Sequence, residues 1–145
     1  MRAINSYNTI NIIIAEDDPL NQKIAIKMLK KLGYHADVAS NGIEVLKALE
    51  NQVYDIVLMD IQMPGMDGIE AIRIIRKCWS PGPRIIVATA FALDTCRDLC
   101  NDVGADDLLA KPLKKEELKA AIERNMCRPS DTLLGLQPIA PELST

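Results

Sequence analysis

The sequence predicts an α/β protein in which a doubly wound, five-stranded parallel sheet carries helices on both faces. Patterns typical of a strand and of a helix alternate five times along the chain, and this order is the one that such a fold requires. The expected strands are unbroken apolar runs, as expected for parallel strands that are covered on both faces. A chain of 145 residues is long enough for one domain with a substantial core.

The first half of the chain predicts two strands, each followed by a helix. The first strand covers about residues 11–15. Asp18 and Pro19 then suit the cap and first position of a helix, and Gly33 suits its end. Between them, apolar residues repeat at helical spacing: Leu20, Ile24, Met28 and Leu32. A second strand covers residues 34–39, and Asn41 with Glu44 resembles a capping box at the start of the next helix.

The second half predicts three further strand and helix pairs. The strands cover residues 56–60, 85–89 and 108–110, and the helices cover residues 68–78, 93–103 and 114–126. In the helix 68–78, one apolar face is formed by Ile69, Ile72 and Ile75. Arg73, Arg76 and Lys77 are therefore expected to face solvent. The sequence Ser80-Pro81-Gly82-Pro83 indicates a break after that helix.

Polar side chains follow four of the five expected strands at the point where each strand ends. In an open parallel sheet the ligand site lies beyond the carboxyl ends of the strands. These ends therefore predict one shared site, formed by Glu16-Asp17-Asp18, Asp60, Thr89 and Lys111.

These residues, with the turn Met63-Pro64-Gly65 and the pair Lys111-Pro112, resemble the receiver domain of two-component response regulators. The likeness is greatest to receivers paired with hybrid histidine kinases, and it runs from about Asn11 to Asn125. It implies a flavodoxin-like (βα)5 receiver fold. We therefore expect a lead-in at residues 1–10, a receiver domain at 11–126, and a flexible tail or linker at 127–145, where prolines lie among Ser and Thr.

Clustered carboxylates repel one another unless a cation lies between them, and Mg²⁺ prefers such oxygen ligands. The resemblance implies that Asp17, Asp60 and the backbone carbonyl of Gln62 bind Mg²⁺, while Glu16 acts through a water molecule. It also implies that Asp60 is the phosphoacceptor and that Lys111, Thr89 and the backbone N–H of Ala90 bind the phosphoryl group. A cis peptide bond before Pro112 is a further implication.

Two positions depart from the family pattern. Leu108 stands where many receivers carry Tyr or Phe, which makes the usual aromatic coupling doubtful. Phe91, the single Phe of the chain, is predicted to shield the acyl phosphate and slow its loss; packing against the following helix is an equally good interpretation.

The expected function is that of a phosphoryl-accepting receiver in a two-component phosphorelay. It would not be an enzyme with a separate substrate, although it would catalyse its own phosphorylation and slow dephosphorylation. The expected partners are a histidine kinase or histidine phosphotransfer protein and an effector that binds the face of residues 93–124, with the protein a monomer or a phosphorylation-dependent dimer.

Three alternatives remain open. A phosphatase could use Asp60 as nucleophile, but Gln62 stands where such enzymes place a general acid. A docking-only receiver would keep the fold without accepting phosphate. A flavin-binding relative would cradle phosphate on a loop rich in Ser, Thr and Gly, whereas this edge is acidic.

The composition limits the partners further. The net charge of −3 argues against direct binding of nucleic acid. We expect no membrane span and no signal peptide, and therefore a cytoplasmic location. Cys96 and Cys100 lie one helical turn apart, but two small helical residues are a better interpretation than a metal site.

Overall fold

The computed structural model describes residues 10–61, 68–90 and 93–126, which form a five-stranded sheet with five helices. All strand pairs are parallel, and the strands lie in the order β2-β1-β3-β4-β5. The strands are β1 (Ile12–Ala15), β2 (Ala36–Ala39), β3 (Ile56–Asp60), β4 (Arg84–Thr89) and β5 (Asp107–Ala110). The helices are α2 (Pro19–Lys31), α3 (Gly42–Asn51), α4 (Gly68–Cys78), α5 (Leu93–Val103) and α6 (Lys115–Met126).

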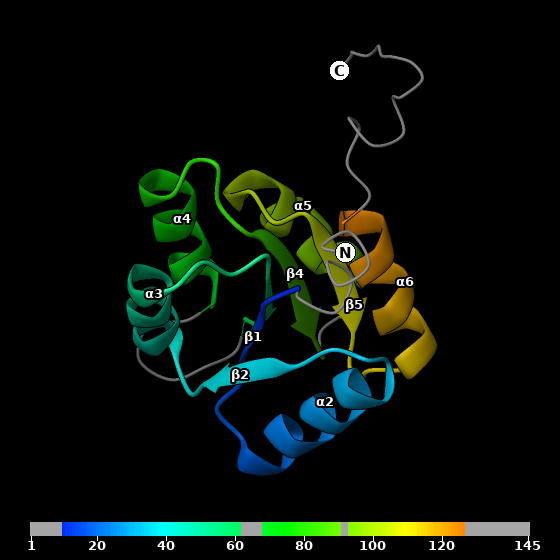
Figure 1. Ribbon diagram of the computed structural model, residues 1–145. Coiled ribbons are helices and arrows are strands. Elements are labelled where there is room, and N and C mark those ends of the chain that lie inside the picture. Colours follow the sequence, from blue (N-terminus) through cyan, green and yellow to red (C-terminus); the bar gives the residue numbers. More distant parts are fainter. Residues whose placement is uncertain (1–9, 62–67, 91–92, 127–145) are drawn as a thin grey trace, which may run out of the picture.

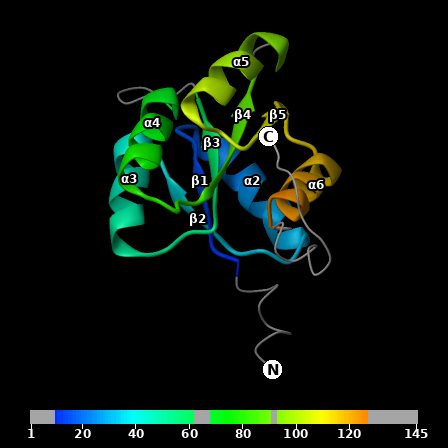
Figure 2. The same ribbon diagram turned by 90° about the horizontal axis from the view of Figure 1, so that it is seen from above.

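The helices cover both faces of the sheet, as predicted (Figures 1 and 2). One buried cluster packs α3, α4 and α5 against alternate strand residues such as Val57 and Ile85. The other packs α2 and α6 against the intervening residues, such as Ile56 and Ile86. Because β1, β3 and most of β4 are buried on both faces, their sequences are unbroken apolar runs.

Hydrogen bonds confirm the two predicted helix caps, Asp18 and Asn41. The Asp18 carboxylate accepts the backbone N–H of Leu20 at 2.9 Å, and Asn41 Oδ1 accepts that of Glu44 at 2.9 Å. Glu44 in turn accepts the N–H of Ser40 at 2.7 Å. The reciprocal bond of the capping box thus goes to the residue before the cap, so both backbone donors are satisfied.

The second strand is shorter than predicted. Tyr34 donates its backbone N–H to the Leu29 carbonyl at 2.8 Å, and Gly33 adopts a φ of 94°. Tyr34 therefore belongs to the end of α2, where a left-handed glycine lets the following N–H satisfy a helix carbonyl. For this reason β2 begins at Ala36.

Only the second half of the predicted apolar repeat of α2 packs on the sheet, where Met28 and Leu32 contact the buried cluster. Leu20 and Ile24 are 64% and 44% exposed, whereas Ala25 and Leu29 are buried. The small side chain of Ala25 suits a helix that lies close to the sheet. Two aliphatic side chains consequently remain at the surface near the carboxyl ends of the strands.

Arg76 was expected to face solvent, and this expectation is wrong. Its guanidinium donates to the Gly104 carbonyl at 2.8 Å, to the Pro83 carbonyl at 2.8 Å and to Asp106 at 2.6 Å. Asp106 also accepts the backbone N–H of Ile85 at 2.8 Å. The Arg76 side chain therefore connects α4 to the turns before β4 and β5, at the sheet end opposite the clustered acids.

Tyr54, just before β3, donates its hydroxyl to Asp37 of β2 at 2.5 Å. Burial, followed by this hydrogen bond and the charge of Asp37, raises the pKa of Tyr54 to about 12.

None of the helices in the described ranges has the length and apolar character needed to cross a membrane. The predicted lead-in and tail fall almost wholly on residues 1–9 and 127–145, outside the described residues, and stay predictions.

Candidate functional site

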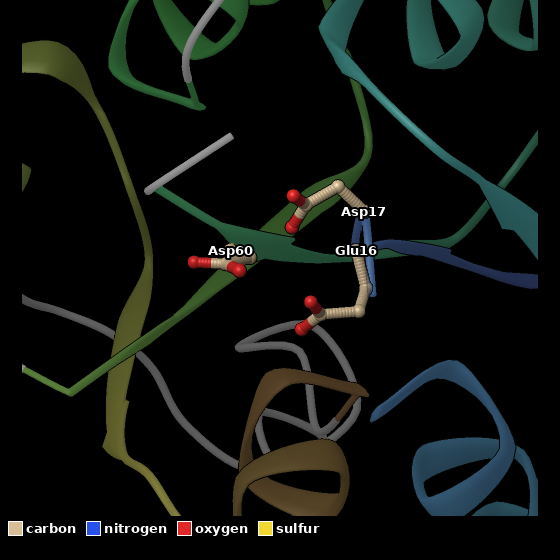
Figure 3. Close-up of side chains that lie close together, drawn as sticks. All are labelled: Glu16, Asp17 and Asp60. Atoms are coloured by element: carbon tan, nitrogen blue, oxygen red, sulfur yellow. The ribbon is translucent and has the colours of Figure 1, made fainter. Parts of the chain in front are cut away.

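Three carboxylates converge where β1 and β3 end (Figure 3). Since β1 and β3 are adjacent, with Ala15 opposite Met59, the residues that follow, Glu16 and Asp60, emerge side by side. Oxygens of Glu16, Asp17 and Asp60 lie within 4.8 Å of one another. Glu16 and Asp60 are each 5% exposed, whereas Asp17 is open to solvent.

Lys111 lies between two of these acids. Its ammonium is 2.8 Å from Glu16 Oε1 and 3.0 Å from Asp60 Oδ2. Burial alone would lower the pKa of Lys111, but the hydrogen bonds and charges of Glu16 and Asp60 outweigh it and raise that pKa. The backbone N–H of Lys111 donates to the Thr89 carbonyl at 2.8 Å, and the predicted cis bond before Pro112 is present.

Glu16 is held at several points. Its Oε2 accepts the backbone N–H of Asp18 at 3.2 Å, while Oε1 receives the lysine. Its backbone carbonyl accepts the Gln22 side chain at 2.6 Å, and its N–H donates to the Ala39 carbonyl at 3.0 Å. Glu16 therefore links β1, α2 and Lys111, and Gln22 is a supporting residue that the sequence pattern did not single out.

The backbone of Asp60 is contacted closely by the start of α4. A Cβ atom at Gly68 would lie 2.6 Å from both the Asp60 carbonyl oxygen and the Ile61 Cα. No real side chain fits at such distances, so α4 can begin here only with glycine. Gly68 also donates its N–H to the Ile61 carbonyl at 3.4 Å.

A cavity of about 360 Å³ opens beside the acids. The polar part of its lining consists of Glu16, Asn21, Asp60 and Lys111. Ala90 also lines it, and α2 and the turn after β5 contribute an apolar part that includes Ile24, Ala25, Pro112 and Leu113. A small charged group can reach the carboxylates from this side.

The other predicted site residues are placed as follows. Thr89 is fully buried at the end of β4, and Ala90 is exposed at the cavity. Leu108 is half-buried and packs against the core on the side of α3, α4 and α5. Gln62 and Phe91 lie outside the described residues, so their proposed roles stay predictions.

The donor set suits a hard divalent cation. The three carboxylates offer only oxygen ligands, and they carry three negative charges against the one positive charge of Lys111. Two negative charges thus remain without a neutralising cation among these four groups. Mg²⁺ is bound in proteins by one or two carboxylates together with water, and this arrangement fits it.

The family model of the response regulator receiver domain matches residues 12–123. The chain belongs to this family. The receiver domain of a sensor histidine kinase from Pseudomonas aeruginosa PAO1, solved with a magnesium ion coordinated in its active site cleft, is 38% identical with a TM-score of 0.74, covering 81% of this chain and 98% of that chain. The response regulator TrrA from Thermotoga maritima, solved in complex with Mg²⁺-BeF, is 33% identical with a TM-score of 0.72, covering 79% and 97%.

Among curated proteins, this receiver is similar to hybrid histidine kinases. Hybrid signal transduction histidine kinase K of Dictyostelium discoideum is 38% identical over 135 residues, which are 88% of this chain and 11% of that protein. Histidine kinase 5 of Arabidopsis thaliana is 31% identical over 140 residues, 78% of this chain and 15% of that protein. The receiver thus spans only a small part of these relatives, and the two-component assignment concerns this part alone.

Proposed function

We propose that this receiver accepts a phosphoryl group on Asp60 from a phosphohistidine of a histidine kinase or phosphotransfer protein, and that the modified domain changes its binding to a partner. The observation that carries the proposal is the pairing of a buried Asp60 with Lys111 inside a cluster of three carboxylates. The similarity to receivers of hybrid histidine kinases supports the same donor class.

The chemistry is a displacement at phosphorus. An Asp60 oxygen forms the new P–O bond, the P–N bond to the donor imidazole breaks, and the electron pair of that bond leaves with the imidazole. Transfer of a highly charged group depends mainly on positioning and charge neutralisation. Lys111 contacts Asp60 at 3.0 Å, and in this proposal it would bind a phosphoryl oxygen there.

Other groups would hold the metal and the product. Asp17, Asp60 and the Gln62 carbonyl would bind Mg²⁺, with Glu16 acting through water, and the bound ion would neutralise charge on the phosphoryl oxygens. The backbone N–H of Ala90 would donate to the phosphoryl group from the cavity wall. The Thr89 hydroxyl, buried in this structure, would have to turn toward the new charge, and this movement would couple Asp60 to the face of residues 93–124.

The surface beside the cavity suits a protein donor. Leu20 and Ile24 are exposed on α2, and Ile24 lines the cavity that contains Asp60. Exposed aliphatic side chains next to a charged centre favour contact with an apolar helix or loop of a partner. We assign this side to the phosphodonor and residues 93–124 to the effector.

Mass spectrometry of the intact protein tests the proposal. Incubation with acetyl phosphate and Mg²⁺ should add one phosphoryl group to the native chain and none to Asp60→Asn. Asp98→Asn, a change at an exposed α5 position, serves as the matched control and should still be modified. An unmodified native chain would reject the proposal and favour the docking-only alternative. That alternative is supported by the half-buried Leu108, which stands where many receivers carry an aromatic switch residue.

A further inference from the structure

A second hollow lies at the sheet end opposite Asp60. It is a groove of about 550 Å³ between the end of α3, the end of α4 and the start of β4. Its wall contains Val53, Trp79, Pro81, Pro83, Arg84 and Asp106. The volume lies within the range of ordinary ligand sites, and nothing in the proposed phosphotransfer uses this groove.

The groove has an apolar, aromatic rim that is open to solvent. Val53 is 79% exposed, Pro81 is exposed and Trp79 is half-buried. Grooves lined by aromatic side chains bind proline-rich segments, because the polyproline II conformation is largely preformed and loses little entropy on binding. The composition of this rim therefore favours an extended proline-containing peptide.

The charges in the groove favour an acidic residue in that peptide. Asp106 is paired with the Arg76 guanidinium at 2.6 Å, and Asp55 accepts the backbone N–H of Asn11 at 2.8 Å. Both acids therefore already have hydrogen-bond donors, although only Asp106 has a cationic partner. Arg84 meets Asp106 only at 3.5 Å. A guanidinium has five N–H donors, so Arg84 keeps donors available for a carboxylate.

The chain itself contains a matching sequence. Pro138-Ile139-Ala140-Pro141 has two prolines three residues apart, followed by Glu142. In polyproline II geometry, residues three apart share one face and lie about 9 Å from each other. Two prolines could thus contact the aromatic rim while the following glutamate pairs with a cation.

The last described helix ends at the same end of the sheet as this groove, on the opposite face. Near the end of α6, Arg124 donates to Asp107 at 2.7 and 2.9 Å and Asn125 donates to it at 2.8 Å, and the neighbouring Asp106 lines the groove. The turn between α4 and β4 and the last turn of α6 lie at the same end of the sheet, the upper end in Figure 1. Residues 127–137 separate α6 from Pro138 and span at most about 40 Å when extended, which is ample.

We propose that the groove at Trp79 and Arg84 binds the segment Pro138–Glu142 of the same chain. A linker of this length supplies an effective concentration of roughly 1 mM. If the groove bound the free segment with a Kd of about 0.1 mM, this effective concentration would keep the groove occupied in about nine chains of ten.

The single tryptophan of the chain, Trp79, reports directly on the groove. In the full chain, the triple variant Pro138→Ala, Pro141→Ala, Glu142→Gln should make Trp79 fluorescence severalfold more sensitive to acrylamide and shift its emission to the red. Pro129→Ala, a proline outside the motif, is the control and should leave the fluorescence unchanged. Arg84→Gln should show part of the effect of the triple variant, because it removes the partner of Glu142.

Two further measurements complete the test. A synthetic peptide of residues 136–143, added to the triple variant at about 1 mM, should restore the shielding of Trp79, and shielding in the native chain should not change on dilution. Equal quenching of the native chain and the triple variant would overturn the proposal, as would failure of the peptide to restore shielding. Shielding that disappears on dilution would also overturn it, because a second copy would then occupy the groove.

Discussion

Replacing Lys111 by Met should have opposite effects on metal binding and on phosphorylation. The lysine now contacts Glu16 at 2.8 Å and Asp60 at 3.0 Å, so it neutralises part of the charge that would attract Mg²⁺. A divalent ion and an ammonium about 5 Å apart repel each other by roughly 1.7 kcal/mol at the dielectric constant of water, the appropriate limit beside the solvent-exposed Asp17. Removing that repulsion should lower the Kd for Mg²⁺ roughly tenfold to twentyfold.

Phosphorylation of the same variant should slow. Loss of a preorganised donor to a developing negative charge costs about 10² to 10³ in rate in comparable sites. Metal affinity is measured by titration calorimetry, and the rate is measured by mass spectrometry with acetyl phosphate at saturating Mg²⁺. Lys114→Met, an exposed neighbour, is the control and should change neither quantity. Weaker or unchanged Mg²⁺ binding in Lys111→Met would show that the charge argument is mistaken.

Three other substitutions test separate parts of the molecule. Arg76→Ala should lower the free energy of unfolding in urea by about 3 kcal/mol, since three charge-assisted hydrogen bonds are lost. The control Arg73→Ala, at an exposed position, should change that free energy by less than about 0.5 kcal/mol. Similar values for the two variants would contradict a stabilising role of the Arg76 hydrogen bonds. Tyr54→Phe should cost about 1 kcal/mol at neutral pH. The pKa of Tyr54 in the folded chain is raised to about 12 from the ordinary 10.0, so the native chain should lose stability as the pH rises from 10 toward 12. Thermal unfolding measured across this pH range should show a smaller loss of stability for Tyr54→Phe. Phe91→Ala should shorten the lifetime of phosphorylated Asp60, and an unchanged lifetime would favour a packing role.

The arrangement of strands and the set of acids could be predicted because each rests on a local pattern. Apolar runs such as Ile12–Ala15 fix a strand, and parallel order then brings the residues after β1 and β3 together without further information. Asp18 and Asn41 marked helix starts for a similarly local reason, since a cap bonds to residues two or three positions away.

Contacts between distant segments could not be predicted in the same way. Arg76 donates to Gly104 and Asp106, which lie 28 and 30 residues further along the chain. Its position on the helix, taken alone, had predicted a side chain that faces solvent. Gln22 bonds to a backbone carbonyl of Glu16, an acceptor that every residue possesses. The first half of the α2 face was misjudged, because Ala25 contributes little to an apolar count although its small size lets the helix lie close to the sheet. Met28 and Leu32 do pack on the core as predicted.

Gly68 packs against the backbone of Asp60, so it affects the position of this residue although it does not line the cavity beside the acids. With a Cβ atom only 2.6 Å from the Asp60 carbonyl oxygen, even alanine there would have to displace the strand that carries the Asp60 carboxylate. The position of the proposed phosphoacceptor thus depends partly on the absence of a methyl group at residue 68. A loss of phosphorylation in a variant at position 68 would therefore indicate a misplaced Asp60, although every acid and the lysine were intact.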